Sequence, residues 1–206
     1  QRLAATGPDE APKFKLRSSF EVPLTACQTL VDAAPKGLMP TIAGIKMAGS
    51  IALKGHANFD TTRIDHDYDV DWATANSCRV TGVPPTIDVK NFQHVFTRSV
   101  YTPTGARTEV KSGPGSGNWA SYTHISHFME TAVITCEDGR FESHDGFDHE
   151  AIVNSIRENL RTGKFVRGAS TISMQLAKNL YLTRDKTISR KLEEAILTMY
   201  LEQALT

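Results

Sequence analysis

The feature that most constrains the fold of this chain is a change in the spacing of its hydrophobic residues at the glycine-rich segment "SGPGSGN", residues 112–118. Before this segment, short runs alternate apolar and polar residues, most clearly between Ile45 and Ala73, as half-buried strands do. After it, apolar residues recur three and four positions apart, which is the period of one face of a helix. We therefore predict an α+β chain, with a mainly β region of unknown role at residues 1–118 and a helical region at 119–206.

The β region carries few other signals. Residues 1 to about 18 are expected to be a flexible lead. Residues 94–111 have the pattern of a hairpin, with its turn at residues 103–105. His56, His66 and the alternating aspartates between Asp65 and Asp71 could suggest a metal site, but alternating aspartates on a strand more often mark a solvated face. We favour the solvated face.

The helical region is expected to hold four helices. The first should present Glu137 at its end. Asp148 can cap the second, which should stop at Gly163, while Ser170 or Thr171 opens the third and Thr187 or a neighbour opens the fourth. The residues predicted to face the core are Ile125, Phe128, Met129, Ala132, Val133 and Cys136 in the first helix, Ile152, Val153, Ile156 and Leu160 in the second, Ile172, Leu176 and Leu180 in the third, and Ile188, Leu192, Ala195, Ile196 and Met199 in the fourth.

Charge is balanced overall but uneven along the chain. The 206 residues include 23 basic and 23 acidic side chains, so net charge identifies no partner. Residues 137–150 hold six acids and one base, whereas residues 161–191 hold eight bases and one acid. An acidic segment beside a basic one suits a substrate that carries both a reacting hydroxyl and phosphates. A solvated acidic loop is the simpler alternative.

The three cysteines show no metal-binding spacing, and their odd number leaves at least one thiol free. Cys27 and Cys78 could pair in an oxidising compartment, although spacing alone does not decide this. Cys136 ends an apolar stripe and is expected to be a small buried residue rather than a nucleophile. No run reaches the length of about 18 apolar residues that a membrane span needs.

The third predicted helix has an unusual polar face, because neutral hydrogen-bonding groups and one cation stand where surface helices usually carry Glu and Lys pairs. Its residues Thr171, Gln175, Lys178 and Asn179 suit an oxygen-rich ligand, and Ser170 precedes them at a helix start that favours an anion. Alternatively, Ser170 is only an N-cap and the rest is solvated surface. On the fourth helix, the spacing of Arg190, Lys191 and Glu194 is also that of ordinary surface ion pairs.

Three segments taken together resemble a known family. "EDGRFESHDG" (137–146), "GASTISMQLAKN" (168–179) and "RKLEEAILTMYLE" (190–202) are similar, in this order, to the first three motifs of the family 51 glycosyltransferases, the peptidoglycan transglycosylases of penicillin-binding proteins and monofunctional polymerases. Ala169 and the pair Ser173-Met174 depart from the second motif. The fourth motif would lie beyond Thr206, so we expect only the N-terminal part of such a domain, and no transpeptidase motif is recognised.

The resemblance implies roles for individual residues. Members of this family have an α-helical, lysozyme-like lobe with a membrane-dipping subdomain, and they join lipid-linked disaccharides. By similarity, Glu137 is the general base and Glu194 the second important glutamate, which orients basic residues or a divalent ion. The residues expected to bind substrate are Ser170, Thr171, Gln175, Lys178, Asn179, Arg190 and Lys191. The residues expected to shape the motifs are Asp138, Arg140, Phe141, His144, Gly146 and Gly168, with Phe141 as an apolar anchor and His144 as a loop-fixing hydrogen-bonder.

The resemblance also implies a setting. The expected partners are lipid II, the lipid-linked glycan strand, a membrane surface and other proteins of cell-wall synthesis, with no nucleic acid. The expected location is the bacterial envelope, on the periplasmic side of the cytoplasmic membrane. A divalent cation, Mg²⁺ or Mn²⁺, would suit the pyrophosphate, but only Glu194 stands out as a candidate ligand. Two alternatives stay open: a degenerate relative that binds lipid-linked glycan without polymerising it, and a lysozyme-like hydrolase, for which the basic segment is unnecessary.

Overall fold

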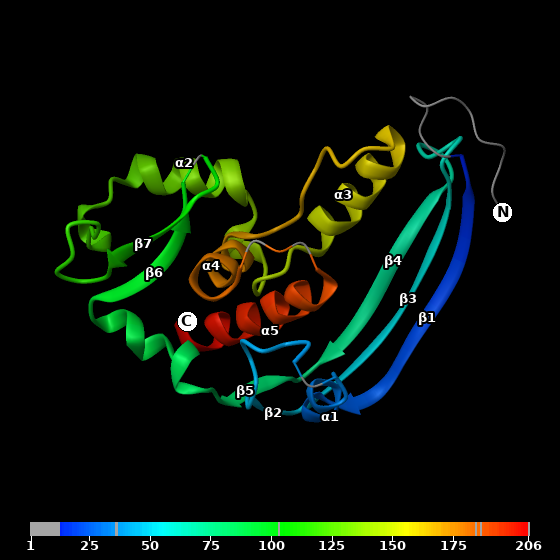
Figure 1. Cartoon of the computed structure of the whole chain (residues 1–206). Helices are drawn as coiled ribbons and strands as arrows, with labels where there is room; N and C mark the ends of the chain where they lie inside the picture. Colours follow the sequence, from blue (N-terminus) through cyan, green and yellow to red (C-terminus); the bar gives the residue numbers. More distant parts are fainter. Residues whose placement is uncertain (1–12, 36, 103, 184, 186, 206) are drawn as a thin grey trace. The chain divides into compact units, whose positions relative to one another are not determined.

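The computed structural model describes residues 13–35, 37–102, 104–183, 185 and 187–205. Within these residues, every strand lies at or before Ser112, and the four helices longer than two turns begin at or after His127 (Figure 1). This order confirms the predicted α+β class. The chain divides into two compact units, each built from separate stretches of sequence. The first unit contains residues up to 32, 48–78 and 148–169, and the second contains residues 33–47, 79–147 and 170 onward.

An antiparallel sheet forms the frame of the first unit. Its strands are β1 (Lys15–Ala26), β3 (Ser50–Asp60) and β4 (Tyr68–Asn76), in the order β1-β3-β4 (Figure 1). The predicted flexible lead is wrong for residues 15–18, because they pair with β3, and residues 1–12 of that prediction lie outside the described residues.

The register of the sheet separates its two faces, because successive side chains of a strand point to opposite sides. One face collects apolar residues and the other collects charged ones. The apolar face carries Leu16, Phe20 and Val22 from β1, Leu53, Ala57 and Phe59 from β3, and Tyr68, Val70 and Trp72 from β4.

A disulfide joins Cys27, the first residue of the short helix α1 (Cys27–Asp32), to Cys78, just after β4. The Cα atoms of the two cysteines are 5.8 Å apart. Gly49 lies beside this bridge with φ +86°, and a Cβ atom there would stand 2.0 Å from the carbonyl oxygen of Ser77. The pairing left open by the sequence is thus confirmed, and it ties the ends of β1 and β4 together.

Helix α3 (His149–Thr162) completes the first unit, and both of its predicted ends are confirmed. The Asp148 carboxylate accepts a hydrogen bond of 2.7 Å from the Ala151 N–H, and Gly163 ends the helix in the left-handed region at φ +64°. Tyr68 of β4 donates its hydroxyl to the Val153 carbonyl at 2.7 Å. Helix α3 therefore covers the β4 side of the apolar face.

The second unit contains two small two-stranded sheets and several 3₁₀ turns. Strand β2 (Lys46–Ala48) pairs with β5 (Arg79–Gly82). Strands β6 (Phe96–Tyr101) and β7 (Arg107–Ser112) form the predicted hairpin, although Pro103 of its predicted turn lies outside the described residues. The 3₁₀ turns are η1 (Pro85–Ile87), η2 (Val89–Gln93), η3 (Tyr122–His124) and η4 (Phe141–Ser143).

Helices α4 (Ile172–Tyr181) and α5 (Ile188–Leu205) pack against each other, but not through the predicted faces. Ile188 and Leu192 are exposed, at 83% and 50% of their surface, whereas Glu193 and Glu194 of α5 are buried. On α4, Leu176 is exposed. The residues that these two helices bury are Ser173, Met174, Ala177, Glu193, Glu194, Leu197, Thr198, Tyr200 and Leu201. The predicted burial is wrong for Leu176, Ile188 and Leu192, whereas the other predicted residues of α4 and α5 are half-buried. The glutamates can be buried because their partners offset the cost of desolvation.

Helix α2 (His127–Glu137) forms where the period predicts it, yet none of its residues is buried within the part of the chain that the structure describes. Phe128 and Met129 are 85% and 59% exposed. Cys136 is also exposed, so its predicted burial is wrong. The predicted stripe is present in the helix, but none of the described residues covers it.

Candidate active site

Glu137 is the last residue of α2, and its exposed carboxylate is held by a residue from α4. The side-chain amide of Gln175 donates a hydrogen bond of 2.9 Å from Nε2 to Oε2 of Glu137. Two residues that were singled out on separate segments of the sequence are therefore in direct contact. The contact fixes the direction of the carboxylate while its other oxygen stays available.

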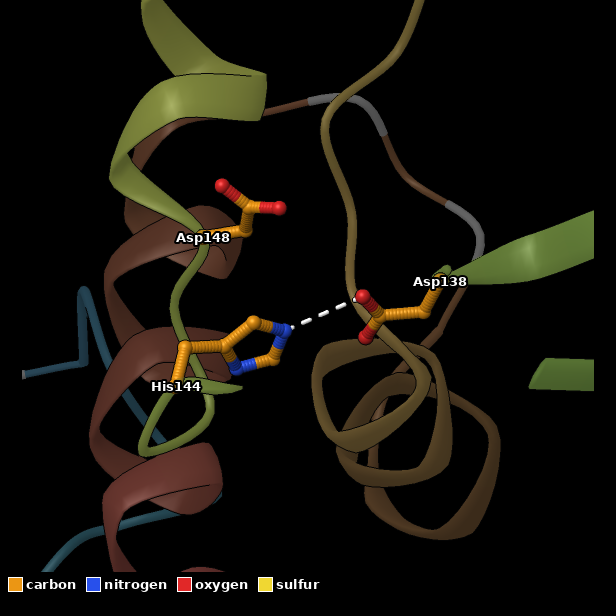
Figure 2. Close-up of side chains that lie close together, drawn as sticks. All are labelled: Asp138, His144 and Asp148. Atoms are coloured by element: carbon orange, nitrogen blue, oxygen red, sulfur yellow. Dashed lines mark hydrogen bonds and ion pairs between the residues drawn. The ribbon is translucent and has the colours of Figure 1, made fainter. Parts of the chain in front are cut away.

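Asp138 follows Glu137, and its side chain points into the protein. There it connects the acidic loop, residues 138–148 between α2 and α3, to α4. Its Oδ1 lies 3.0 Å from Nε2 of His144 (Figure 2), and its Oδ2 accepts a hydrogen bond of 3.0 Å from the Ile172 N–H at the start of α4. The side chains of Asp138 and His144 are 4% and 9% exposed. His144 thus contacts the loop residue Asp138, and both oxygens of Asp138 have partners that hold it in place beside Glu137.

The rest of the acidic loop is shaped by small turns. Arg140 accepts a backbone hydrogen bond of 2.8 Å from Ser143 across η4. The Phe141 ring lies edge-on to the His144 ring, with centroids 6.4 Å apart. Gly146 has φ +83°, and a Cβ atom there would come within 2.9 Å of side-chain atoms of Thr198 and Glu202. Only glycine fits this position without strain.

Thr171 is the N-cap of α4, which settles the choice between Ser170 and Thr171. Its hydroxyl accepts a hydrogen bond from the Met174 N–H and donates one of 2.7 Å to the Gly146 carbonyl. Thr171 is buried, at 2% exposure. Its hydrogen-bonding capacity is therefore used inside the protein, in a structural role rather than toward an open surface.

Glu194 forms a second cluster on α5, together with Arg190 and Lys191. Its Oε2 lies 2.8 Å from a guanidinium nitrogen of Arg190, and its Oε1 pairs with the ammonium group of Lys191. The Lys191 ammonium also lies 3.4 Å from the Ser170 hydroxyl oxygen. Because Glu194 is only 2% exposed, the carboxylate acts as a buried anchor that holds both cations, and it places the Lys191 ammonium beside Ser170, just before α4.

Lys178 and Asn179 lie on the outer part of α4. Lys178 is half-buried and Asn179 is exposed, and neither side chain has a hydrogen-bond or ion-pair partner among the described residues. Arg184 and Lys186 of the basic segment lie outside those residues. Gly168 belongs to the first unit, and a Cβ atom there would meet nothing within 4 Å, so its position imposes no steric need for glycine.

Two further acids were missed by the sequence analysis. Glu193 is 4% exposed and accepts a hydrogen bond of 2.7 Å from the Thr41 N–H. Glu202 accepts a hydrogen bond from the Ser173 hydroxyl. Neither residue has a sequence signal beyond its helical spacing, because its partner comes from a distant part of the chain. Both residues hold α5 in place, one through Thr41 and the other through Ser173 of α4.

Glu194 fits poorly as a metal ligand, because both of its oxygens already face cations. A divalent ion bound there would be repelled by Arg190 and Lys191.

Sequence comparisons cover the part of the chain that carries these residues. Residues 106–206 match the sequence model of the transglycosylase family. The biosynthetic peptidoglycan transglycosylase of Nitrosospira multiformis is 47% identical over 88 residues, which are 43% of this chain and 38% of that protein. The protein of the same name from Dechloromonas aromatica is 46% identical over 96 residues, which are 47% of this chain and 42% of that protein. The one from Chromobacterium violaceum is 51% identical over 87 residues, which are 42% of this chain and 38% of that protein.

Residues 106–206 belong to the transglycosylase family. The chain spans about two fifths of the length of these curated relatives. The transglycosylase region begins within the β6–β7 hairpin and includes Glu137, Gln175 and the Glu194 cluster. Among the described residues, no helix combines the length and apolar character that crossing a membrane requires.

Proposed function

We propose that the protein is a peptidoglycan glycosyltransferase that polymerises lipid II into glycan strands, with Glu137 as general base. The observation that carries the proposal is the Glu137–Gln175 hydrogen bond, which lies within the transglycosylase region and connects its first two motifs. The names of the relatives support the same chemistry. An exposed carboxylate at a helix end, held by a neutral donor, suits proton abstraction from a sugar hydroxyl.

The proposed reaction joins two lipid-linked sugars. The Glu137 carboxylate takes the proton of the acceptor hydroxyl as the hydroxyl oxygen attacks the anomeric carbon of the donor. The bond between that carbon and the pyrophosphate oxygen breaks, and the pyrophosphate leaves with the electron pair. Glu137 ends protonated and returns the proton to solvent. No acid is needed at the leaving group, because a pyrophosphate is stable as an anion.

Three cations on α4 and α5 would stabilise that leaving group. Arg190 and Lys191 are held by Glu194, and Lys178 stands on α4 without a partner among the described residues. Charge that develops on a pyrophosphate oxygen is stabilised most by donors that are already in place. Ser170 and Asn179 would supply neutral hydrogen bonds to the same group.

The setting follows from the same proposal. The substrate would be presented at a membrane surface, on the periplasmic side of the cytoplasmic membrane, with other cell-wall synthesis proteins as further partners. The Cys27–Cys78 disulfide supports this side, because such bonds persist in oxidising compartments such as the periplasm.

The test is incubation of the protein, as the cell makes it, with lipid II and a divalent ion, followed by separation of the products on a gel. The proposal predicts a ladder of glycan strands. Binding of lipid II without strands would instead favour the binding-only relative, and release of short fragments from preformed glycan would favour a hydrolase. Either of these results would overturn the proposal.

The basic cluster can be tested in the same assay. Lys178→Met should lower the rate of polymerisation about 10- to 100-fold, because removing one preorganised donor from a developing charge has effects of this order or larger. Lys111→Met is the matched control, because Lys111 is an exposed lysine on β7 whose side chain takes part in none of the contacts described above. Equal rates for the two variants would remove Lys178 from the proposed site.

A further inference from the structure

The outer edge of the three-stranded sheet presents a long strand that none of the described residues covers. Strand β1 stands at one edge of the order β1-β3-β4 (Figure 1). Ten of its twelve residues are exposed, among them Leu16 and Phe20, each at 41%. An edge of this length is a template for another strand, because its outward N–H and C=O groups lack ladder partners.

The hydrogen-bond pattern shows which residues face outward. Phe14 and Thr61 pair directly, since the Thr61 N–H donates to the Phe14 carbonyl at 3.1 Å. In an antiparallel ladder, alternate residues bond to the same neighbour, so Leu16, Ser18 and Phe20 bond toward β3. The backbone groups of Lys15, Arg17, Ser19 and Glu21 therefore point away from the sheet.

We propose that β1 pairs with β1 of a second copy of the protein, antiparallel and centred on Ser18, which joins two sheets into one of six strands. In this register, Lys15 lies opposite Glu21 of the other copy, and Arg17 lies opposite Ser19. Leu16 lies opposite Phe20, so the exposed apolar residues of each copy contact those of the other. Each of the four residues whose backbone groups point outward is therefore opposite another such residue, so their N–H and C=O groups can bond across the new pair of strands.

Charge complementarity supports this register. Within one copy, Lys15 lies opposite Asp60 and Glu21 opposite Lys54 across the β1–β3 pair. The Lys15 ammonium contacts the Asp60 carboxylate at 2.8 Å. Across the joined sheet, one row would read Asp60, Lys15, Glu21, Lys54, so that each charge has opposite charges beside it. Opposite charges on facing strands stabilise a sheet, whereas like charges destabilise it.

Proline selects this register over the next one. A shift of the centre to Ser19 would place Pro23 opposite Lys15, at a position that must donate a hydrogen bond. Proline lacks the N–H and would break the ladder there. With the centre at Ser18, the ladder runs from Lys15 to Glu21 and ends before Pro23.

Cysteine cross-linking tests the register directly, in a Cys136→Ser background of the intact protein that removes the exposed free thiol. Ser18→Cys should form a dimer under mild oxidation with glutathione disulfide, because residues facing each other at a non-hydrogen-bonded site have Cα atoms about 4.5 Å apart. Ser19→Cys is the matched control, because Ser19 is also exposed. In this register the Ser19 residues of the two copies are diagonal neighbours about 7–8 Å apart, which is too far for a disulfide without backbone movement. Equal cross-linking of the two variants, or none with Ser18→Cys, would overturn the proposal.

Sedimentation equilibrium provides the second measurement. The wild-type protein should be a dimer, and Ser19→Pro should be a monomer with an unchanged circular dichroism spectrum. The Ser19 N–H points outward, so proline removes a contact with the second copy without removing a bond to β3. A wild-type monomer, or a folded Ser19→Pro dimer, would contradict the proposal.

Discussion

The two compact units differ in where they place charge. In the first unit, the sheet separates apolar and charged residues onto opposite faces, as the alternating sequence predicts. In the second unit, α5 buries Glu193 and Glu194 while Ile188 and Leu192 stay exposed. A buried carboxylate is costly unless it is paired and hydrogen-bonded. The difference shows that the helices of the second unit are arranged around specific polar contacts, and these contacts surround the proposed active site.

The largest effect on stability is expected from Glu194→Ala. Removing this carboxylate leaves Arg190, which is only 16% exposed, without its ion-pair partner, and should lower the free energy of unfolding by about 3 kcal/mol. Glu158→Ala is the control, since the exposed Glu158–Arg161 pair is expected to contribute less than about 1 kcal/mol. Urea unfolding of both variants measures the difference. Similar losses in the two would mean that the buried and exposed pairs are equivalent.

Gly146→Ala should have the next largest effect. The residue has φ +83°, and the new methyl group would contact Thr198 and Glu202, so we expect a loss of about 1–3 kcal/mol in the free energy of unfolding. Gly168→Ala is the control and should change stability by less than about 0.5 kcal/mol, because its added methyl group meets no other atom. A neutral Gly146→Ala variant would show that the acidic loop can shift away from α5.

Asp60 provides a pH-dependent test of the first unit. Hydrogen bonds from Lys15 and Thr62 hold the pKa of this carboxyl well below its usual range. A carboxyl with a depressed pKa in the folded state stabilises the protein fully above its unfolded pKa of about 4, and this contribution is lost as the pH falls. The stability difference between wild type and Asp60→Asn should therefore be constant near neutral pH and shrink below about pH 4. A difference that does not change on acidification would argue against the ion pair.

The smallest effect is expected on α2. Phe128 is 85% exposed, so Phe128→Ser should change the free energy of unfolding of this chain by less than about 0.5 kcal/mol. Leu197→Ala on α5 should lower it by about 2–5 kcal/mol, because Leu197 is fully buried. A large loss for Phe128→Ser would mean that α2 packs against a surface in solution, and would weaken the contrast between α2 and α5.

Features that depend on local chemistry were predictable from the sequence. The cap at Asp148, the stop at Gly163 and the β6–β7 hairpin follow from residue types at fixed spacing, and the structure confirms them. The burial of α5 could not be predicted in this way, because it depends on Thr41, more than a hundred residues away, and on cations beside Glu194. Hydrophobic period predicts that a helix forms, but it does not identify the surface that the helix meets.

The candidate site was predictable only in part. The motifs identified Glu137 and Gln175, and their contact appears only in the fold. The role of Thr171 changed for a physical reason, because its side chain is buried and its one hydroxyl donor is already bonded to Gly146. Ser170 and Thr171 have the same chemistry in sequence, so only the backbone path determines which one caps α4.

The most direct test of the proposed mechanism compares the polymerisation rates of Glu137→Gln and Glu142→Gln with lipid II. Both substitutions remove one exposed carboxylate from the first motif, and Glu142 takes part in none of the contacts described for the site. We predict that Glu137→Gln lowers the rate at least about 100-fold, the usual contribution of a general base, while lipid II binding persists and Glu142→Gln stays near wild type. Equal rates for wild type and Glu137→Gln would contradict the assignment of Glu137 as the base.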